Sequence, residues 1–214
     1  MTNKYLEEET SDGTPTVRNP LNNKLYHSKS GAIEEAKEKY CKALKIKEVK
    51  NPVIYDVCFG LGYNTLEALK YLEDKKACFY MFEIDTDLLR FVANDFNPKI
   101  KGYDIIKEVV RKKSTTINNK QYELITGDFR KTITNIEEKA HFVFFDPFSP
   151  KTDPHLWTKE VFEKIYEKLH PNGKLATYSY ARKTRENLEA AGFILSDGPV
   201  LGRRSPSIIA KKTK

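Results

Sequence analysis

The sequence lacks the features that mark several classes of protein. It has three cysteines in 214 residues, Cys41, Cys58 and Cys78, and no CxxC motif, so we expect reduced thiols rather than disulfides. No apolar run approaches the roughly 20 residues of a membrane span, and the first residues have no apolar core of the kind found in signal peptides. The four histidines are scattered and predict no metal site. We therefore expect a cytoplasmic protein without membrane or metal partners.

Basic residues are in excess, because 37 Lys and Arg stand against 30 Asp and Glu and give a net charge of +7. Two explanations compete: a polyanionic partner such as a nucleic acid, or the Lys- and Glu-rich composition of a heat-adapted protein. The segment IEEAKEKYCKALKIKEVK mixes both signs, and we interpret it as a solvated helix face. Residues 111–120 and 202–214 contain no acid. These two segments are the places where the sequence indicates nucleic-acid binding.

Apolar runs and helical patterns alternate along most of the chain. Strands are expected at 53–60, 77–83, 121–127, 141–146 and 174–180, with shorter ones near 193–195 and 207–210. Helices are expected to open at Ser30, to span 63–72, 85–96, 157–170 and 182–191, and to begin at Asp128, with a hairpin turn at 118–120. This predicts an α/β, Rossmann-like fold with a mostly parallel seven-stranded sheet and helices on both faces. Residues 1–50 are expected to form an N-terminal segment and helix packed on a domain of residues 51–214.

Glycine or acidic residues follow four expected strands, at the edge where parallel sheets bind ligands. After the first strand, Gly60 and Gly62 let the backbone approach a ligand closely. Glu83 ends the second strand, where it can accept hydrogen bonds from both hydroxyls of a ribose or serve as an ordinary surface acid or cap. Asp128 follows the third, where it can accept from an adenine amino group or cap its helix. Asp146 ends the fourth, inside FFDPFSP.

Together these strand ends form the pattern of a class I S-adenosylmethionine-dependent methyltransferase. A dinucleotide enzyme is disfavoured, because Thr65 stands where the third glycine of G-x-G-x-x-G would be. S-adenosylmethionine has no pyrophosphate and needs less of that glycine loop. We therefore expect S-adenosyl-L-methionine as the cofactor, with these residues binding it: Phe59, Gly60, Gly62, Asn64, Glu83, Asp128 and Asp146.

Several blocks of the chain resemble the methyltransferase domain of the MnmC family, bacterial enzymes that finish a wobble-uridine modification in tRNA. The blocks are YHSKSGAIEEA (26–36), GLGYN (60–64), FEID (82–85), DPFSP (146–150), WTKEVF (157–162), PNGKLATYSYA (171–181), AAGF (190–193) and GRR (202–204). They span nearly the whole chain, from about residue 11 to 210. The chain departs from the family pattern in having PNG where PGG is usual and Cys58 in the turn after the first strand.

The resemblance implies an enzyme that N-methylates the 5-aminomethyl group of uridine, with or without a 2-thio group, at the wobble position in the anticodon arm of tRNA. The best-known members carry a second, FAD-dependent domain, and the sequence shows no flavin-binding segment, so only the methyl-transfer half is implied. Other enzymes on the same fold remain as alternatives: a methyltransferase of adenine or glutamine amino groups, or an aminopropyltransferase. A non-catalytic RNA-binding domain is an alternative of another class.

The expected catalytic residue is Asp146. A carboxylate beside the sulfonium can accept an N–H bond from the substrate amine, orient its lone pair and take up the proton. The expected substrate contacts are Asp12 in the N-terminal segment, Phe148 by stacking on the base, Tyr178 and Tyr180 after the fifth strand, and Arg203 and Arg204 against phosphate or at the pocket rim. A core position for Phe148 or for one tyrosine, and a solvated tail turn for the arginines, are the structural alternatives.

Overall fold

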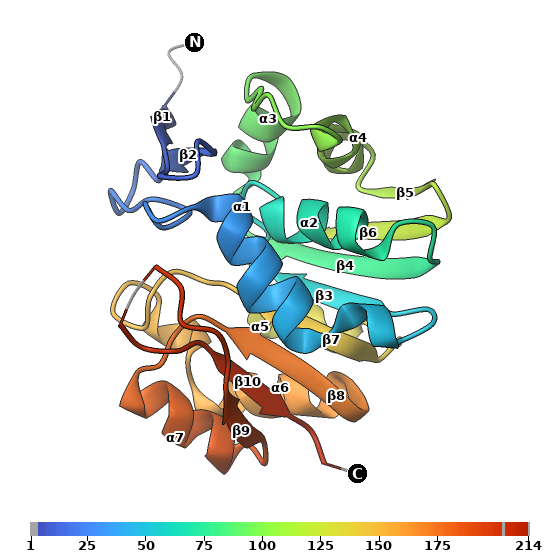
Figure 1. The fold of residues 1–214 in the computed structure, drawn as a ribbon, viewed down its shortest axis with the longest axis vertical. Coiled ribbons are helices and arrows are strands. Elements are labelled where there is room, and N and C mark those ends of the chain that lie inside the picture. The colour runs from blue at the N-terminus through green and yellow to red at the C-terminus, as the bar shows by residue number, and fades with distance from the viewer. Residues whose placement is uncertain (1–3, 203, 214) are drawn as a thin grey trace.

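Eight strands form one mixed sheet in the computed structural model, which describes residues 4–202 and 204–213 (Figure 1). They are β3 (Val53–Val57), β4 (Ala77–Glu83), β5 (Ser114–Ile117), β6 (Lys120–Thr126), β7 (Ala140–Phe145), β8 (Leu169–Thr177), β9 (Ile194–Asp197) and β10 (Ile208–Lys211). Their order is β5-β6-β4-β3-β7-β8-β10-β9. The central strands β6, β4, β3, β7 and β8 pair in parallel, and β5 and β10 run antiparallel to their neighbours. The predicted α/β fold with a mostly parallel sheet is confirmed.

The sheet has one strand more than the seven predicted. The additional strand is β5, which forms a hairpin with β6. Asn118 and Asn119 make the turn with φ of 48° and 63°, a conformation that asparagine tolerates and that suits the twist of a two-residue hairpin. The turn was predicted, but β5, the strand before the turn, is only four residues long. A strand of that length is too short for an alternating apolar pattern to identify it as part of the main sheet.

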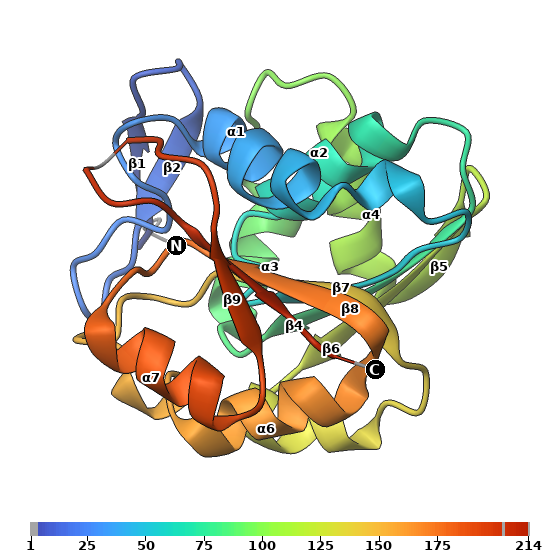
Figure 2. The same ribbon diagram turned by 60° about the horizontal axis from the view of Figure 1, so that its bottom comes forward.

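Helices cover both faces of the sheet (Figure 2). One face carries α2 (Tyr63–Leu72), α3 (Thr86–Asn94), α4 (Tyr103–Lys112) and the N-terminal helix, in which α1 (Ala32–Glu35) continues into the π-helical η1 (Ala36–Lys42). The other face carries α5 (Phe129–Thr132), α6 (Lys159–Lys168) and α7 (Arg182–Ala190). Short 3-10 turns are η2 (Ile46–Glu48), η3 (Ile133–Asn135) and η4 (Pro154–Leu156). No described helix is long and apolar enough to span a membrane.

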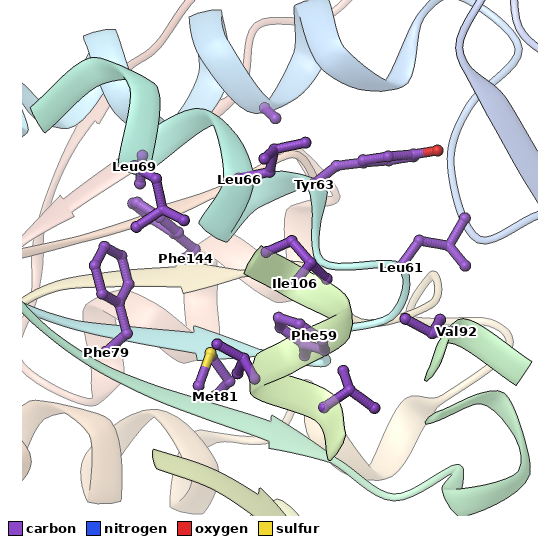
Figure 3. Close-up of a cluster of buried hydrophobic side chains, with 14 of the residues drawn as sticks. Phe59, Leu61, Tyr63, Leu66, Leu69, Phe79, Met81, Val92, Ile106 and Phe144 are labelled. Carbon is purple, nitrogen blue, oxygen red and sulfur yellow. The ribbon is translucent and has the colours of Figure 1, made fainter. Parts of the chain in front are cut away.

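Successive side chains of a strand point to opposite faces of the sheet, so each strand contributes to two hydrophobic cores, one on each face. In β7, Phe142 and Phe144 join the core on the side of α2 and η1, whereas Val143 and Phe145 join the core on the side of α6. Figure 3 shows the first core, in which Phe79, Met81 and Phe144 of the sheet lie near Leu66, Leu69 and Ile106 of the helices. Continued alternation past the end of β7 turns Asp146 toward the face that η1 covers.

Local sequence explains several helix boundaries. Asp85 accepts a hydrogen bond from Leu88 N at 2.9 Å, and Asp128 accepts one from Arg130 N at 3.0 Å, so the predicted helix starts there are confirmed. Ser30 does not cap its helix, because the N-cap is Gly31 and the Ser30 hydroxyl bonds that of Ser28. The helix predicted at 157–170 is shorter, and spans Lys159–Lys168.

The N-terminal segment, residues 4–48, adds a separate layer to the strand ends. Its strands β1 (Leu6–Glu9) and β2 (Pro15–Arg18) form a two-stranded antiparallel sheet. The Tyr5 and Tyr26 hydroxyls both donate to the Asp85 carboxylate at 2.9 Å, which anchors the segment beside β4. Gly202 of the C-terminal loop, at φ 67°, comes so near the start of α1 that a Cβ would lie 2.1 Å from Ser30 Oγ. The GRR and YHSKSG blocks, far apart in sequence, therefore meet in space.

Candidate active site

A cavity of about 930 Å³ opens at the carboxyl edge of β3, β4, β6 and β7. This volume lies in the range of small-molecule and cofactor sites. Eight of the residues predicted for the site line it: Phe59, Gly60, Asn64, Glu83, Asp128, Asp146, Phe148 and Tyr178. The N-terminal segment supplies further lining, including Tyr26, His27 and Glu35. The structure thus brings the strand ends and the N-terminal segment together around one cavity.

Backbone hydrogen bonds continue past the ends of the strands and fix the loops that carry the site. Asp146 N donates to Val57 O at 3.2 Å, Phe59 N to Phe82 O at 2.9 Å, and Gly127 N to Glu83 O at 2.9 Å. Each bond joins a loop to the neighbouring strand. The loops after β3, β6 and β7 are therefore held in register by the sheet, before any side chain contributes.

The two glycines of the GLGYN block have different tasks. Gly60, at φ 59°, lines the cavity, and a Cβ there would meet the Tyr26 ring at 3.4 Å. Gly62, at φ 78°, does not line the cavity; a Cβ there would lie 2.7 Å from both Ile106 Cγ2 and Phe59 Cζ. Gly62 allows the turn into α2 and the close packing of Phe59, so its predicted contact with the cofactor stays a prediction.

Glu83 ties three backbone groups together at the end of β4. Its Oε2 accepts from Gly60 N at 2.9 Å, and its Oε1 accepts from Ile84 N and Asp85 N at 2.8 Å each. The side chain is 6% exposed, and burial raises the pKa of its carboxyl. A carboxylate has about four acceptor sites, so one lone pair remains for a ligand hydroxyl. The carboxylate shapes the glycine turn and faces the cavity at the same time.

Asp128 combines the two alternatives considered for it. It caps α5, and it also forms a two-pronged pair with Arg130, in which Nε lies 2.9 Å from Oδ1 and Nη2 lies 2.6 Å from Oδ2. The Arg130 guanidinium lowers the pKa of the Asp128 carboxyl. Both side chains line the cavity. Arg130 was not predicted, although it stands two residues after an acid at a helix start.

Asp146 lies at the inner end of the cavity, directed toward the N-terminal helix. Its Oδ2 accepts from Asn64 Nδ2 at 3.0 Å, which joins the DPFSP and GLGYN blocks. Burial raises the pKa of its carboxyl, while the nearby Tyr40 hydroxyl and Asn64 amide lower it. Tyr40 itself is buried and makes no hydrogen bond of standard geometry within the described residues. A carboxylate so placed can accept an N–H bond from a bound amine.

Two hydrogen bonds hold the loop after β7. Trp157 Nε1 donates to Phe148 O at 2.8 Å, and the Tyr178 hydroxyl donates to Pro147 O at 2.9 Å. The Phe148 ring lies 5.1 Å from that of Tyr26, at the cavity wall rather than in either core. Trp157 belongs to the WTKEVF block and Tyr178 to the LATYSYA block. These two blocks therefore supply the hydrogen-bond donors that position the DPFSP loop, which explains why the three blocks occur together.

Other predicted substrate residues lie away from the cavity lining. Asp12 accepts from Thr10 Oγ1 at 2.6 Å, Thr14 N at 3.0 Å and Glu34 N at 3.2 Å, and so ties the β1–β2 turn to α1. Tyr180 donates to Asp197 at 2.9 Å and carries the Arg185 guanidinium over its ring. Arg204 is exposed, and Arg203 lies outside the described residues. Their substrate contacts stay predictions.

The charged residues of the N-terminal helix were not predicted as part of the site. Lys39 was expected on a solvated face, and that was wrong: Lys39 is 1% exposed, and its Nζ lies 2.5 Å from Glu35 Oε1. Glu35 lines the cavity. Tyr40 was not among the predicted site residues, although its hydroxyl approaches Asp146. The sequence did contain a signal for this pair: Glu35 and Lys39 are four residues apart, a spacing at which opposite charges meet on one helix face, and Tyr40 follows directly.

Asp56 is a second acid below the cavity floor. It is fully buried in β3, and its Oδ2 accepts from Thr65 Oγ1 at 2.7 Å. Burial raises its pKa to about 7, against the opposing effect of Thr65. The bond fixes the first turn of α2, and Thr65 is the residue that replaces the third glycine. The hydrogen bond to Asp56 therefore explains why a threonine, rather than glycine, stands at position 65.

The lining fits S-adenosyl-L-methionine chemically. Glu83 keeps an acceptor site for a ribose hydroxyl, and Gly60 keeps the glycine turn free of a side chain. Asp146 places negative charge where a sulfonium is favoured. Among the described residues, no three histidine, cysteine or acidic side chains are grouped to hold a metal ion, and the three cysteines are unpaired, as predicted.

Comparison with known proteins agrees with this geometry. Residues 93–213 match a family of S-adenosyl-L-methionine-dependent methyltransferases. An uncharacterized protein of Methanocaldococcus jannaschii is 36% identical over 98% of this chain and 60% of its own length. The bifunctional tRNA 5-methylaminomethyl-2-thiouridine biosynthesis protein MnmC of Leptospira interrogans is 24% identical over 86% of this chain, which spans only 32% of that relative. The crystal structure of MnmC2 from Aquifex aeolicus superposes with a TM-score of 0.83 at 30% identity, covering 96% of this chain and 70% of that one.

More distant structures share the fold alone. A spermidine synthase superposes with a TM-score of 0.58 at 11% identity over 98% of this chain. The family match, by contrast, covers more than half of the chain, and the Aquifex structure extends the likeness over nearly all of it. S-adenosyl-L-methionine is accordingly the cofactor. The chain belongs to the S-adenosyl-L-methionine-dependent methyltransferases and is a methyltransferase domain of the MnmC type.

Proposed function

We propose that this protein methylates the amino group of 5-aminomethyluridine, with or without a 2-thio group, at the wobble position of tRNA. The product is 5-methylaminomethyluridine, formed in the cytoplasm where tRNA is available. The observation that carries the proposal is Asp146: a carboxylate at the inner end of the cavity, hydrogen-bonded on one side by Asn64 and approached on another by Tyr40. The relatives named MnmC add the substrate class.

The reaction needs a neutral amine in line with an activated methyl group. Bound S-adenosyl-L-methionine supplies that methyl group on a sulfonium. The substrate amine arrives as an ammonium and must lose one proton; the nitrogen lone pair then forms the new N–C bond, and the electron pair of the broken C–S bond stays on sulfur. Asp146 accepts an N–H bond and takes the proton, and its burial helps because a raised pKa makes the carboxylate a better base.

The aromatic wall can hold the base. A wobble uridine must leave its stack to reach a cavity of this depth. Phe148 and Tyr26 present rings 5.1 Å apart at the cavity wall, and Tyr178 lies on the Pro147 side of the same loop. Ring faces stack on bases with little dependence on sequence. In the proposal, Asp146 recognises the amine, while these rings hold the pyrimidine.

The excess of basic residues over the whole chain, a net charge of +7, supports a polyanionic substrate. The cavity itself is lined by more acidic than basic residues, and of its basic residues Arg18 and Lys29 pair with Glu8, and Arg130 pairs with Asp128. In the proposal the anticodon arm lies across the mouth of the cavity, while the basic segment at 111–120 lies toward the amino end of β6, away from it.

The test is methyl transfer to three matched tRNAs. They carry 5-aminomethyluridine, its carboxymethylated form, or unmodified uridine at the wobble position, and S-adenosyl-L-methionine carries a labelled methyl group. We expect label only in the aminomethyl tRNA, in a nucleoside heavier by one methylene. Label in the unmodified tRNA would indicate another nucleoside as the target. Cofactor binding by calorimetry without transfer to any of the three would overturn the proposal.

A further inference from the structure

The N-terminal helix carries a buried ion pair at the inner end of the cavity. Lys39 Nζ lies 2.5 Å from Glu35 Oε1, and the exposed fractions of the two side chains are 2% and 15%. One turn along the same helix, Lys42 and Glu38 form a pair of similar length, 2.7 Å, that is far more exposed. The chain therefore offers one buried pair and one exposed pair with the same spacing on one helix.

Lys39 points inward, although it lies among charged residues. Residues 36–42 form a π-helix, in which each residue turns slightly less about the axis than in an α-helix. Lys39, Tyr40 and Cys41 are all buried on the side of the helix that packs on the sheet and α2. Burying a lysine is costly unless it is paired. Glu35, one of the cavity residues, provides that pairing.

The charges at this end of the cavity do not balance. Glu35 and Asp146 are close enough for repulsion by Glu35 to raise the pKa of Asp146, while Lys39 lowers it. His27, also near Glu35, is neutral, because burial lowers its pKa to about 4. The Tyr40 hydroxyl is neutral and buried beside Asp146. Two carboxylates face one ammonium, so a second cation is favoured between them.

We propose that Glu35, fixed by Lys39, is the second carboxylate of the amine subsite and positions the substrate as its ammonium before Asp146 takes the proton. The inference rests on the proposed function, because the ammonium is that of the aminomethyl group. Lys39 pairs with one oxygen of Glu35, Oε1, and Glu35 lines the cavity, so in the proposal the other oxygen meets the ammonium. Gly202 closes this end from outside, since a Cβ there would lie 3.6 Å from Glu35 Oε1. The subsite therefore selects a cationic amine with no carboxylate attached.

The test compares binding of two tRNAs, one with the 5-aminomethyl group and one without it, to the protein loaded with S-adenosylhomocysteine. Their affinity ratio isolates the contribution of the amine. We expect E35Q to lower this ratio by about tenfold, the value of one charge-assisted hydrogen bond, with the affinity for the unmodified tRNA unchanged. E38Q removes the exposed pair on the same helix and should leave the ratio at its wild-type value. An E35Q ratio equal to that of E38Q would overturn the inference.

Two further variants distinguish loss of the Glu35 charge from loss of folding. E35Q leaves Lys39 buried and unpaired, and if it does not fold, the double variant E35Q/K39Q replaces the ion pair by two amides and should show the same loss. E35D retains the charge and should restore part of the ratio, which a purely structural role would not produce. Methylation by the wild type is measured in parallel. Its absence would overturn the proposed function, whereas wild-type methylation with an unchanged E35Q ratio would overturn only the role of Glu35.

Discussion

The cavity has two walls of different construction. The wall formed by the sheet edge places Gly60, Glu83, Asp128 and Asp146 within three residues of a strand end, and backbone bonds between neighbouring strands hold the loops that carry them. The N-terminal wall places Tyr26 and Glu35 through side-chain contacts, such as the bond from the Tyr26 hydroxyl to Asp85 across 59 positions of sequence. The sheet edge is thus fixed by the fold, and the N-terminal segment by tertiary contacts. This difference suggests that chemistry and cofactor binding depend on the first wall, and substrate selection on the second.

The largest expected effect is that of D146N. Removal of a general base typically costs two to four orders of magnitude, so we expect methylation to fall at least about 100-fold while cofactor affinity stays within several-fold. The wild-type rate should rise with pH as the carboxyl loses its proton, and this rise should lie above the ordinary pKa of aspartate, because burial raises that pKa. Single-turnover rates across pH measure both effects. Normal methylation by D146N would remove Asp146 from the chemistry.

A smaller effect is expected for E83A, at the cofactor end of the same wall. Loss of a charged acceptor costs about 1.5–3 kcal/mol, which corresponds to roughly 10- to 100-fold weaker binding of S-adenosyl-L-methionine. The rate at saturating cofactor should change less. Calorimetric titration measures the affinity, and E108A, which removes an exposed carboxylate on α4, is the matched control. Tight cofactor binding by E83A would show that the backbone alone holds the ligand.

The smallest effect is expected for Y26F, in the N-terminal wall. The variant removes a hydroxyl that accepts from Asn19 and donates to Asp85, both at 2.9 Å, but keeps the ring beside Phe148. About 1 kcal/mol of stability should be lost, visible as a lower melting temperature, and cofactor affinity should fall less than in E83A. A loss of cofactor affinity as large as that in E83A would mean that the two walls act as one unit.

The sheet edge could be predicted because its signals are local. An apolar run followed by glycine or an acid specifies a strand and the residue at its end, and Tyr63–Leu72 and Ala77–Glu83 were predicted with the bounds that the structure shows. Helix caps at Asp85 and Asp128 depend on residues two or three positions away. The main error in the sheet was the short strand Ser114–Ile117, which lacks such a signal.

The N-terminal wall could not be predicted in the same way. Lys39 lies in a run of alternating charges that resembles a solvated face, yet it is buried and paired with Glu35 in the folded chain. Asp12 has a polar neighbourhood typical of a binding segment, yet its carboxylate is occupied by Thr10, Thr14 and Glu34. Thr10 and Thr14 are two residues away and Glu34 is 22 away, so whether such an acid is free for a ligand depends on how the chain folds around it.

The sequence by itself determined most of the strands and helices in their order along the chain, the acids at the strand ends and, through the resemblance of its blocks to a known family, the type of cofactor. These features follow from periodicity and turn chemistry, which act over a few residues. Only the tertiary structure decided that Asn64 meets Asp146 across 82 positions, that Glu35 and Lys39 are a buried pair, and that Gly202 meets Ser30. Such contacts arise because packing two layers around one sheet brings distant segments together, and no local pattern encodes which side chains will then face each other.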